Sequence, residues 1–301
     1  MLTIAYMTCR RNPRFEWFVD SLYRQHIGLP LKLLIIDFYR DERDLAEYAN
    51  RVFQAPIATS HPPKPTVWQG KYRRTKQNFF AAANARNTAI CLAEEGYLVF
   101  ADDLSVLTPN WLARARAAER GGYVVCGSYE KALRMVVEDG VIIAKKDHPP
   151  GHDARRKIQT TFGRCPSNWF YGCSCGAPVE AFLRINGYPE IADGMGYEDS
   201  VTGDALSNAG YDLYFDPDML TIESEEAHFE DEPFLRQDPG VSPKDKSHAL
   251  LNICRNQSRF DNYFGEMGIA GLRKLIQLGE PFPIARIPEH EWFTGTRLED
   301  L

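Results

Sequence analysis

The sequence predicts an α/β fold with a mostly parallel central sheet flanked by helices. In the N-terminal third of the chain, short β-prone apolar segments alternate with segments of helical spacing. The first strand, helix and strand follow one another within about forty residues, and the right-handed crossover of such a unit builds a parallel sheet. The composition is 44% apolar and 25% charged, which is typical of a folded domain and excludes a disordered chain.

The first unit of this fold ends at an acidic residue. Residues 2–8 are apolar and β-prone and predict a strand that runs into a polar turn. Apolar residues then recur at helical spacing over 15–23, and Gly28-Leu29-Pro30 ends this helix. Residues 31–36 predict a second strand, which stops at Asp37. In open α/β sheets this carboxyl edge is where ligands bind.

The second acidic strand end follows an alanine-rich helix predicted over 79–95. Residues 97–101 form a buried type of strand that stops at Asp102-Asp103. Residues 123–126 and 141–143 predict further strands.

The rest of the chain predicts a loop and then helices. Alternating charge and Pro149-Pro150-Gly151 predict a long mobile loop between Lys145 and Arg164. After residue 242, apolar residues at 250–254 and 264–276 predict two helices packed on the core.

Charge is distributed unevenly. The chain has 35 Lys and Arg against 41 Asp and Glu, a net charge of -6, which excludes a uniformly basic nucleic-acid coat. Residues 64–86 nevertheless hold six Lys and Arg and no acid, whereas residues 190–245 hold sixteen acids and two cations. Such asymmetry indicates either cationic and acidic sites for charged ligands or simply the solvated faces of a large domain.

The compartment is predicted from apolar runs and cysteines. No apolar run approaches the roughly 18 residues that span a bilayer, so we expect no transmembrane segment. The N-terminus does not follow the charge order of a secretory signal, and we expect a cytoplasmic protein. The seven cysteines are an odd number, which favours free thiols. Cys173-Ser174-Cys175 lacks the second pair of a zinc site and is more simply read as buried thiols.

Three groups of residues have the chemistry of a phosphate and metal site. Adjacent Asp102 and Asp103 supply hard oxygen ligands for Mg²⁺ or Mn²⁺, although a turn or helix cap also explains such a pair. Arg86 suits a phosphate or an acidic loop, because its planar fork donates two parallel hydrogen bonds; a surface salt bridge is the alternative. Glu198 and Asp199 would begin a helix and act there as a general base or only as capping charges.

These groups belong to an ordered series of motifs. The series consists of Thr8 and Arg10, Asp37, Asn84-Ala85-Arg86-Asn87, Phe100-Ala101-Asp102-Asp103, Pro109-Asn110-Trp111-Leu112, Asn186-Gly187-Tyr188 and Gly196-Tyr197-Glu198-Asp199. In order and spacing it resembles the GT-A-fold, family-2-like glycosyltransferases, over roughly residues 2–230. The resemblance implies a GT-A fold and the transfer of a sugar from a nucleotide diphosphate sugar.

The resemblance also implies roles for individual residues. Asp199 looks like the catalytic base of inverting members, and Asp103 with His228 would hold Mn²⁺ or Mg²⁺; without the resemblance His228 would be an ordinary surface histidine. Residues implied to bind the nucleotide sugar are Thr8, Arg10, Asp37, Arg86, Asp102 and Glu198.

Two positions depart from the family pattern. Leu104 replaces the third acid of a DxD motif, so Asp103 would be the principal metal ligand. Asp37 is followed by Phe38-Tyr39 rather than by an acid and a small residue, so base recognition can differ.

The acceptor stays open at this point. We expect a glycosyltransferase domain over 1–241, with a donor half at 1–112 and an acceptor half at 113–241, and a helical extension over 242–301. Basic and aromatic residues are interleaved in 64–86, and 145–164 adds further cations, so a hydroxymethylated DNA base, a glycan or a lipid-linked glycan are the acceptors considered. A nucleotidyltransferase and a non-catalytic sugar-binding protein on the same fold are the alternatives.

Overall fold

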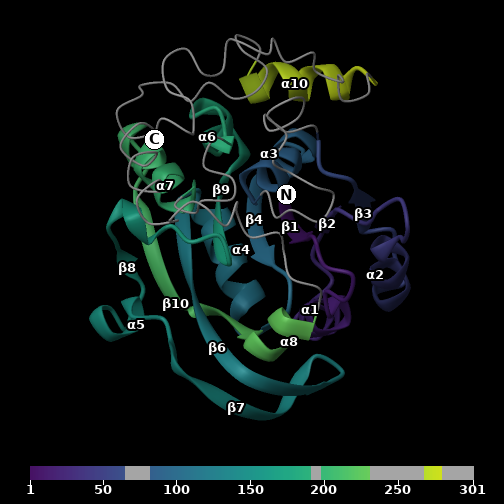
Figure 1. Cartoon of the computed structure of the whole chain (residues 1–301). Helices are drawn as coiled ribbons and strands as arrows, with labels where there is room; N and C mark the ends of the chain where they lie inside the picture. Colours follow the sequence, from purple (N-terminus) through teal and green to yellow (C-terminus); the bar gives the residue numbers. More distant parts are fainter. Residues whose placement is uncertain (65–81, 191–197, 231–267, 280–301) are drawn as a thin grey trace, which may run out of the picture.

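A computed structural model describes residues 1–64, 82–190, 198–230 and 268–279. Its centre is a ten-stranded mixed sheet in which eight strands follow the order β3-β2-β1-β4-β9-β6-β10-β5, while β7 and β8 pair at its margins (Figure 1). The strands are β1 Leu2–Thr8, β2 Leu31–Asp37, β3 Ala58–His61, β4 Tyr97–Asp102, β5 Ser105–Leu107, β6 Val124–Glu138, β7 Val141–His152, β8 Gly163–Arg164, β9 Ser174–Pro178 and β10 Leu213–Ser224.

The N-terminal part of the sheet is parallel, as predicted. Strand β1 pairs in parallel with β2 and β4, and β2 pairs in parallel with β3. The predicted strands at 2–8, 31–36 and 97–101 and the helix over 15–23 are confirmed. The helices are α1 Phe15–Tyr23, α2 Leu45–Phe53, α3 Ala82–Leu92, α4 Trp111–Gly121, α5 Arg155–Ile158, α6 Val179–Arg184, α7 Glu198–Asn208, α8 Glu225–Glu230 and α10 Gly268–Gln277, with a 3₁₀ turn at Ser167–Trp169.

The C-terminal part of the sheet mixes directions. Strand β9 is antiparallel to both β4 and β6, and β6 is parallel to β10. The prediction of a long mobile loop over 145–164 was wrong, because β7 extends to His152 and α5 and β8 follow it. Strand β7 forms a long hairpin with β6 through Asp139 and Gly140, both in the left-handed region that a tight hairpin turn requires. Among the described strands β7 pairs only with β6, and such an edge tolerates its two prolines.

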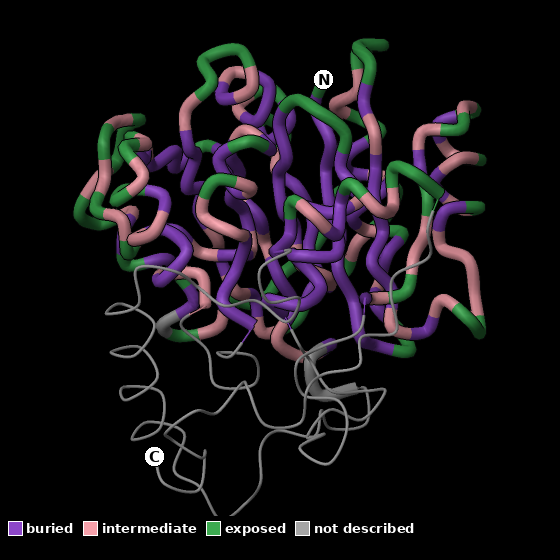
Figure 2. The backbone as a smooth tube through the Cα atoms, turned by 90° about the horizontal axis from the view of Figure 1, so that it is seen from above, coloured by how far each residue is buried: buried purple, intermediate pink, exposed green. Residues whose placement is uncertain are grey.

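Side chains alternate between two cores on the opposite faces of the sheet. Ala5 and Met7 of β1 belong to one core together with residues of α3, α6, α7 and α10. Ile4 and Tyr6 point to the other, which α1, α2 and α4 cover. This alternation is the period of a strand buried on both faces. Figure 2 shows the buried backbone concentrated in the sheet and the exposed residues at the periphery.

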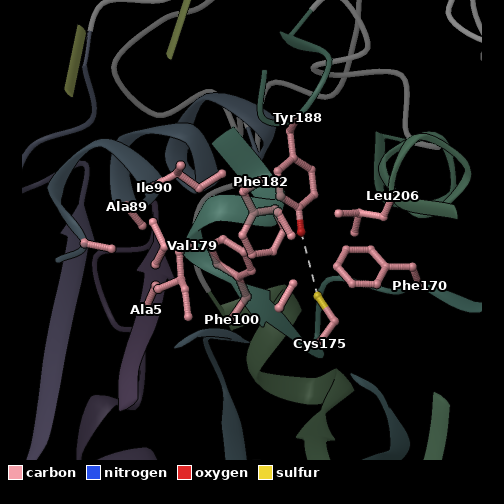
Figure 3. Packing of buried hydrophobic residues seen from close by; sticks show 14 of the residues in the cluster. Ala5, Ala89, Ile90, Phe100, Phe170, Cys175, Val179, Phe182, Tyr188 and Leu206 are labelled. Atoms are coloured by element: carbon pink, nitrogen blue, oxygen red, sulfur yellow. Dashed lines mark hydrogen bonds between the residues drawn. The ribbon is translucent and has the colours of Figure 1, made fainter. Parts of the chain in front are cut away.

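Figure 3 shows the aromatic part of the first core. Phe100 meets Phe182 and Tyr188 edge to face, with ring centroids 5.4 and 5.5 Å apart. The Tyr188 hydroxyl lies 3.7 Å from Cys175 Sγ. Cys175 belongs to the pair that the sequence predicts as buried thiols, and burial raises the pKa of this thiol far above its usual range.

The helix α10 packs against α3 (Figure 1). Ile269 and Leu272 are buried in the first core, and the Ile269 amide donates to Asn186 Oδ1 at 2.8 Å. Arg273 donates to the carbonyl groups of Ile90 and Ala93 at the end of α3. Helix α10 thus falls within the second predicted C-terminal helix, whereas the one predicted at 250–254 lies outside the described residues.

In the part of the chain that the structure describes, no helix is both long and apolar enough to cross a membrane.

Candidate active site

Parallel pairing brings the acidic strand ends to one edge of the sheet. Thr8 lies opposite Asp37 in the pairing of β1 with β2, and Met7 lies opposite Asp102 in the pairing of β1 with β4. Asp103 follows directly after β4. The structure therefore gathers Thr8, Asp37, Asp102 and Asp103 at the carboxyl edge, where open α/β sheets bind ligands.

Asp103 is held by the loop that follows β1. Thr8 Oγ1 donates to Asp103 Oδ2 at 2.7 Å, and Arg10 Nε donates to Asp103 Oδ1 at 3.2 Å. Burial raises the pKa of Asp103 to about 6, although Arg10 and the Thr8 hydrogen bond favour the ionised form. Thr8, Arg10 and Asp103 thus form one hydrogen-bonded group.

Arg86 on α3 joins the other acidic residues. Its Nη2 lies 3.3 Å from Asp102 Oδ1, and its Nη1 lies 3.0 Å from Glu198 Oε1 and 2.9 Å from Asp199 Oδ1. Burial alone would lower the pKa of Arg86, but the carboxylates of Asp199, Asp102 and Glu198 raise it well above its usual value. One buried guanidinium thus connects the end of β4 with the beginning of α7.

The alanine-rich sequence of α3 allows this burial. Ala83, Ala85 and Ala89 are fully buried, so the helix lies close to the sheet and carries Arg86 beneath the surface. Asn87 fixes the neighbouring turn: its Nδ2 donates to the Tyr188 carbonyl at 2.9 Å, and its Oδ1 accepts from the Tyr188 amide at 2.7 Å. The Arg86 guanidinium lies over the Tyr188 ring, 5.4 Å from its centroid.

Asp199 lies in the first turn of α7, as predicted from the sequence. Its Oδ2 accepts the Gly172 amide at 2.9 Å. Its Oδ1 approaches Arg86 Nη1 but has no aligned hydrogen bond among the described residues. Burial, followed by repulsion from Glu198 and Asp102, raises the pKa of Asp199 to about 7 even though Arg86 opposes this shift. A carboxylate tuned in this way can exchange protons near neutral pH.

Gly172 is required by the position of Arg86. A Cβ at residue 172 would overlap the guanidinium of Arg86, so any other residue would displace that side chain. The Gly172 amide also fixes Asp199, and this one glycine therefore touches both the guanidinium and the proposed base. No pattern in the sequence singles it out.

Asp37 is fully buried and paired with a residue that the sequence analysis missed. Arg43 donates from Nε to Asp37 Oδ2 at 2.7 Å and from Nη2 to Oδ1 at 2.9 Å, and the Tyr39 amide donates to Oδ1 as well. Arg43 also donates to the carbonyl groups of Arg10 and Arg11. The Asp37 carboxylate is thus linked through Arg43 to the loop after β1. The contact of Asp37 with a nucleotide base stays a prediction.

Leu104 takes no part in the acidic group. Its side chain is fully buried, and its backbone is left-handed with a φ of 59°. The Ser224 amide donates to the Leu104 carbonyl at 3.2 Å, and α8 begins at the next residue, Glu225. The backbone of His228 in α8 therefore lies within about one helical turn of this contact, but its side chain lies outside the described residues.

Glu223, near the end of β10, is a further acidic residue that the sequence analysis did not single out. It pairs in register with Ser105 and is only 6% exposed. Burial raises its pKa to about 7, a shift that Lys131, 3.2 Å away, opposes and that Asp102 and Asp103 reinforce. The sequence signal that could have identified Glu223 is its position as a carboxylate at the end of a further β-prone segment, β10.

The residues at the end of β4 fit a divalent cation. Asp102 and Asp103 offer hard oxygen atoms, and an oxygen that accepts one hydrogen bond keeps a second lone pair. No three His, Cys, Asp or Glu side chains form a complete ligand set within the described ranges. Mg²⁺ needs only one or two protein carboxylates when phosphates and water complete its shell. The arrangement therefore suits an ion shared with a diphosphate.

Known proteins resemble this chain in sequence and in fold. No protein-family model matches the chain. In an alignment of 179 positions that covers 54% of the chain, it is 24% identical to beta-1,4-galactosyltransferase 5 of Sus scrofa and covers 44% of that protein. The chain thus spans less than half the length of this curated relative.

Solved structures share the fold. S. aureus TarS has a TM-score of 0.52 at 10% identity, over 74% of this chain and 60% of that one. The mannosyltransferase PcManGT from Pyrobaculum calidifontis, in complex with GDP-Man and Mn²⁺, has a TM-score of 0.50 at 17% identity, over 84% and 62%. GalNAc-T7 with UDP, GalNAc and Mn²⁺ has a TM-score of 0.53 at 14% identity, over 83% of this chain and 48% of that one. The chain has the GT-A fold of these glycosyltransferases.

Proposed function

We propose that this protein is a metal-dependent, inverting glycosyltransferase that uses a nucleotide diphosphate sugar. One observation carries the proposal: buried Arg86 bridges Asp102, beside the candidate metal ligands, and Asp199, the candidate base. In this proposal the leaving diphosphate lies near Asp102 and the attacking hydroxyl near Asp199, and Arg86 contacts both carboxylates. The alignment with a galactosyltransferase and the fold shared with sugar transferases support the same activity.

The donor would bind at the carboxyl edge of the sheet. We assign its contacts to Thr8, Arg10, Asp37, Arg86, Asp102 and Glu198, which belong to the loop after β1, the end of β2, α3, the end of β4 and the start of α7. We also propose residues 1–112 as the donor half, 113–241 as the acceptor half and 242–301 as the helical extension. The identity of the nucleotide depends on whether Arg43 keeps its contact with Asp37 when the donor is bound.

Asp103, with His228, would hold Mn²⁺ or Mg²⁺ beside Asp102. Such an ion, when bound, neutralises charge that develops on the departing diphosphate. Thr8 and Arg10 orient the Asp103 carboxylate, so they would determine how readily the ion is held. Arg86 supplies a fixed positive charge near the same place, which suits electrostatic stabilisation of the leaving group.

Asp199 would act as the general base. The Asp199 carboxylate takes the proton of the acceptor hydroxyl, the hydroxyl oxygen forms a bond to the anomeric carbon, and the bond from that carbon to the diphosphate oxygen breaks with inversion. The Gly172 amide keeps Oδ2 in place. A pKa of about 7 suits this role, because a general base is most effective when its pKa is near the working pH.

The acceptor would be a glycan, a lipid-linked glycan or a hydroxymethylated DNA base in the cytoplasm. We favour a glycan, because several cations of 145–164 are already paired; most of the basic and aromatic segment 64–86 lies outside the described residues. Lys145 pairs with Glu130 and Asp147. Arg155 pairs with Asp153, and Arg164 pairs with Asp212. The acidic partners offset part of this positive charge, which reduces the electrostatic attraction for a phosphate backbone.

A donor screen tests the proposed function. Thermal unfolding with each of several nucleotide sugars, with and without Mn²⁺, should show one donor that raises the midpoint only when the metal is present. The same mixture should release a nucleoside diphosphate rather than pyrophosphate, which separates sugar transfer from nucleotidyl transfer. No shift and no release with any donor would favour a non-catalytic protein on this fold.

A further inference from the structure

Two half-buried tyrosines form a pair next to the residue that holds the proposed base. Tyr171 directly precedes Gly172, whose amide donates to Asp199 Oδ2 at 2.9 Å. Tyr129, on β6, faces it with ring centroids 6.3 Å apart and planes inclined by 47°. Both rings are only partly covered. The pair therefore offers aromatic surface one residue away from the contact that fixes the base.

The buried side chain of Arg155 packs against this pair. The Arg155 guanidinium lies over the Tyr171 ring, 4.0 Å from its centroid, and 6.0 Å from that of Tyr129. It is itself fixed by Asp153 and by the carbonyl groups of Gly127 and Trp169. A cation held over an aromatic face attracts the ring, so Arg155 sets the position of Tyr171 before any ligand arrives.

The outer side of the pair suits an uncharged ligand. The Nε, Nη1 and Nη2 atoms of Arg155 all donate already, so this cation has little left to offer an anion. Asp199, whose carboxylate accepts the Gly172 amide, is acidic and does not attract phosphate. Within the described residues, neither Tyr129 nor Tyr171 has a hydrogen-bond partner for its hydroxyl. Rigid amphipathic rings with free hydroxyl groups are suited to stacking and to adaptable hydrogen bonding.

We propose that Tyr171 and Tyr129 form the acceptor subsite and that the acceptor presents a neutral pyranose, which stacks on these rings with a hydroxyl directed at Asp199. The proposal rests on the proposed glycosyltransferase function and narrows its acceptor to a saccharide. Tyr171 and Tyr129 would then be acceptor-binding residues with no part in donor binding, because neither is among the residues assigned to the donor.

The test measures nucleoside diphosphate release with and without acceptor. The probes are methyl glycosides of glucose, galactose, mannose and N-acetylglucosamine, and a DNA oligonucleotide that contains 5-hydroxymethylcytosine. The variants are Tyr171→Ala, Tyr129→Ala and Tyr171→Phe. Tyr214→Ala is the control, since Tyr214 is half-buried and its ring stacks on Phe162, 5.3 Å away, in a separate cluster. Slow donor hydrolysis by water, measured without acceptor, reports whether donor site and base are intact.

We expect one of the methyl glycosides to accelerate the release of nucleoside diphosphate by the wild type. Tyr171→Ala should raise the KM for that glycoside about tenfold, as for the loss of roughly 1.4 kcal/mol of contact, and leave hydrolysis and the donor KM unchanged. Tyr129→Ala should act in the same direction, whereas Tyr171→Phe and Tyr214→Ala should stay close to the wild type.

Three results would overturn the subsite. The first is stimulation by the DNA alone, the second is no stimulation by any glycoside, and the third is an unchanged glycoside KM in Tyr171→Ala. Each of them, with hydrolysis intact, leaves the proposed function standing. A wild type that hydrolyses no nucleotide sugar would instead contradict the function itself, and the subsite with it.

Discussion

Replacement of Asp199 by asparagine should make the protein less active and, above neutral pH, more stable. Asparagine keeps an oxygen that can accept the Gly172 amide, and it has about the same shape as the carboxyl group. It cannot ionise, and it cannot take a proton from an acceptor. Loss of general-base assistance typically lowers a rate about 10²- to 10⁴-fold.

The size of the stability effect follows from the pKa shift. Burial raises the pKa of Asp199 from 3.8 to about 7, so the folded state holds this proton more tightly than the unfolded chain. The resulting stabilisation is complete below pH about 4 and is lost as the pH rises through about 7. Three pKa units correspond to about 4 kcal/mol, which is an upper value because 22% of the side chain is exposed. The advantage of Asp199→Asn over the wild type should therefore grow by at most about 4 kcal/mol from pH 4 to pH 8.

Urea unfolding of the metal-free protein at a series of pH values measures this difference. Glu180→Gln, which changes an exposed acid on α6, controls for the loss of one charge. If Asp199 instead serves mainly as a stabilising partner of Arg86, its replacement should lower stability most at high pH, where the ion pair is complete. Free energies of unfolding that change in parallel with pH for Asp199→Asn and the wild type would refute the reasoning. An Asp199→Asn variant that becomes less stable than the wild type at high pH would also refute it.

Three further predictions concern the same site. Gly172→Ala should lower the free energy of unfolding by about 1–3 kcal/mol and remove most of the activity in a donor-hydrolysis assay, because the added Cβ overlaps Arg86. Gly163→Ala is the control and should change neither stability nor activity, because its added Cβ meets only the flexible end of Gln159. Asp103→Ala should abolish the Mn²⁺-dependent part of donor binding in calorimetry, and donor binding equal with and without Mn²⁺ in the wild type would contradict the metal assignment. The rate of transfer should rise as the pH passes about 7 and Asp199 ionises, and a rate already at its plateau at pH 5 would exclude it as the base.

The sequence predicts the N-terminal part of the fold because the signals there are local. Residues 2–37 contain a complete strand, helix and strand, and the parallel pairing of β1 with β2 and with β4 brings Asp37 and Asp102 to one edge. The meeting of Arg86 with Asp102 and Asp199 agrees with the order of the motifs.

Other features depend on contacts between distant residues. The strands predicted at 123–126 and 141–143 are confirmed as the starts of β6 and β7. The extension of β7 to His152 was missed because its prolines indicate a loop unless the strand lies at an edge. Gly172 matters only because Arg86 lies against it, and Arg43 matters only because its chain folds back onto Asp37. Neither contact has a spacing or a composition that a single sequence could reveal.

The most direct test of the central claim is the product formed from a nucleotide diphosphate sugar with Mn²⁺. The wild type should release the nucleoside diphosphate together with free or transferred sugar. Asp199→Asn should bind the same donor but release the nucleoside diphosphate at least about a hundredfold more slowly. Release of pyrophosphate, or equal turnover by the wild type and Asp199→Asn, would contradict a glycosyltransferase that uses Asp199 as its base.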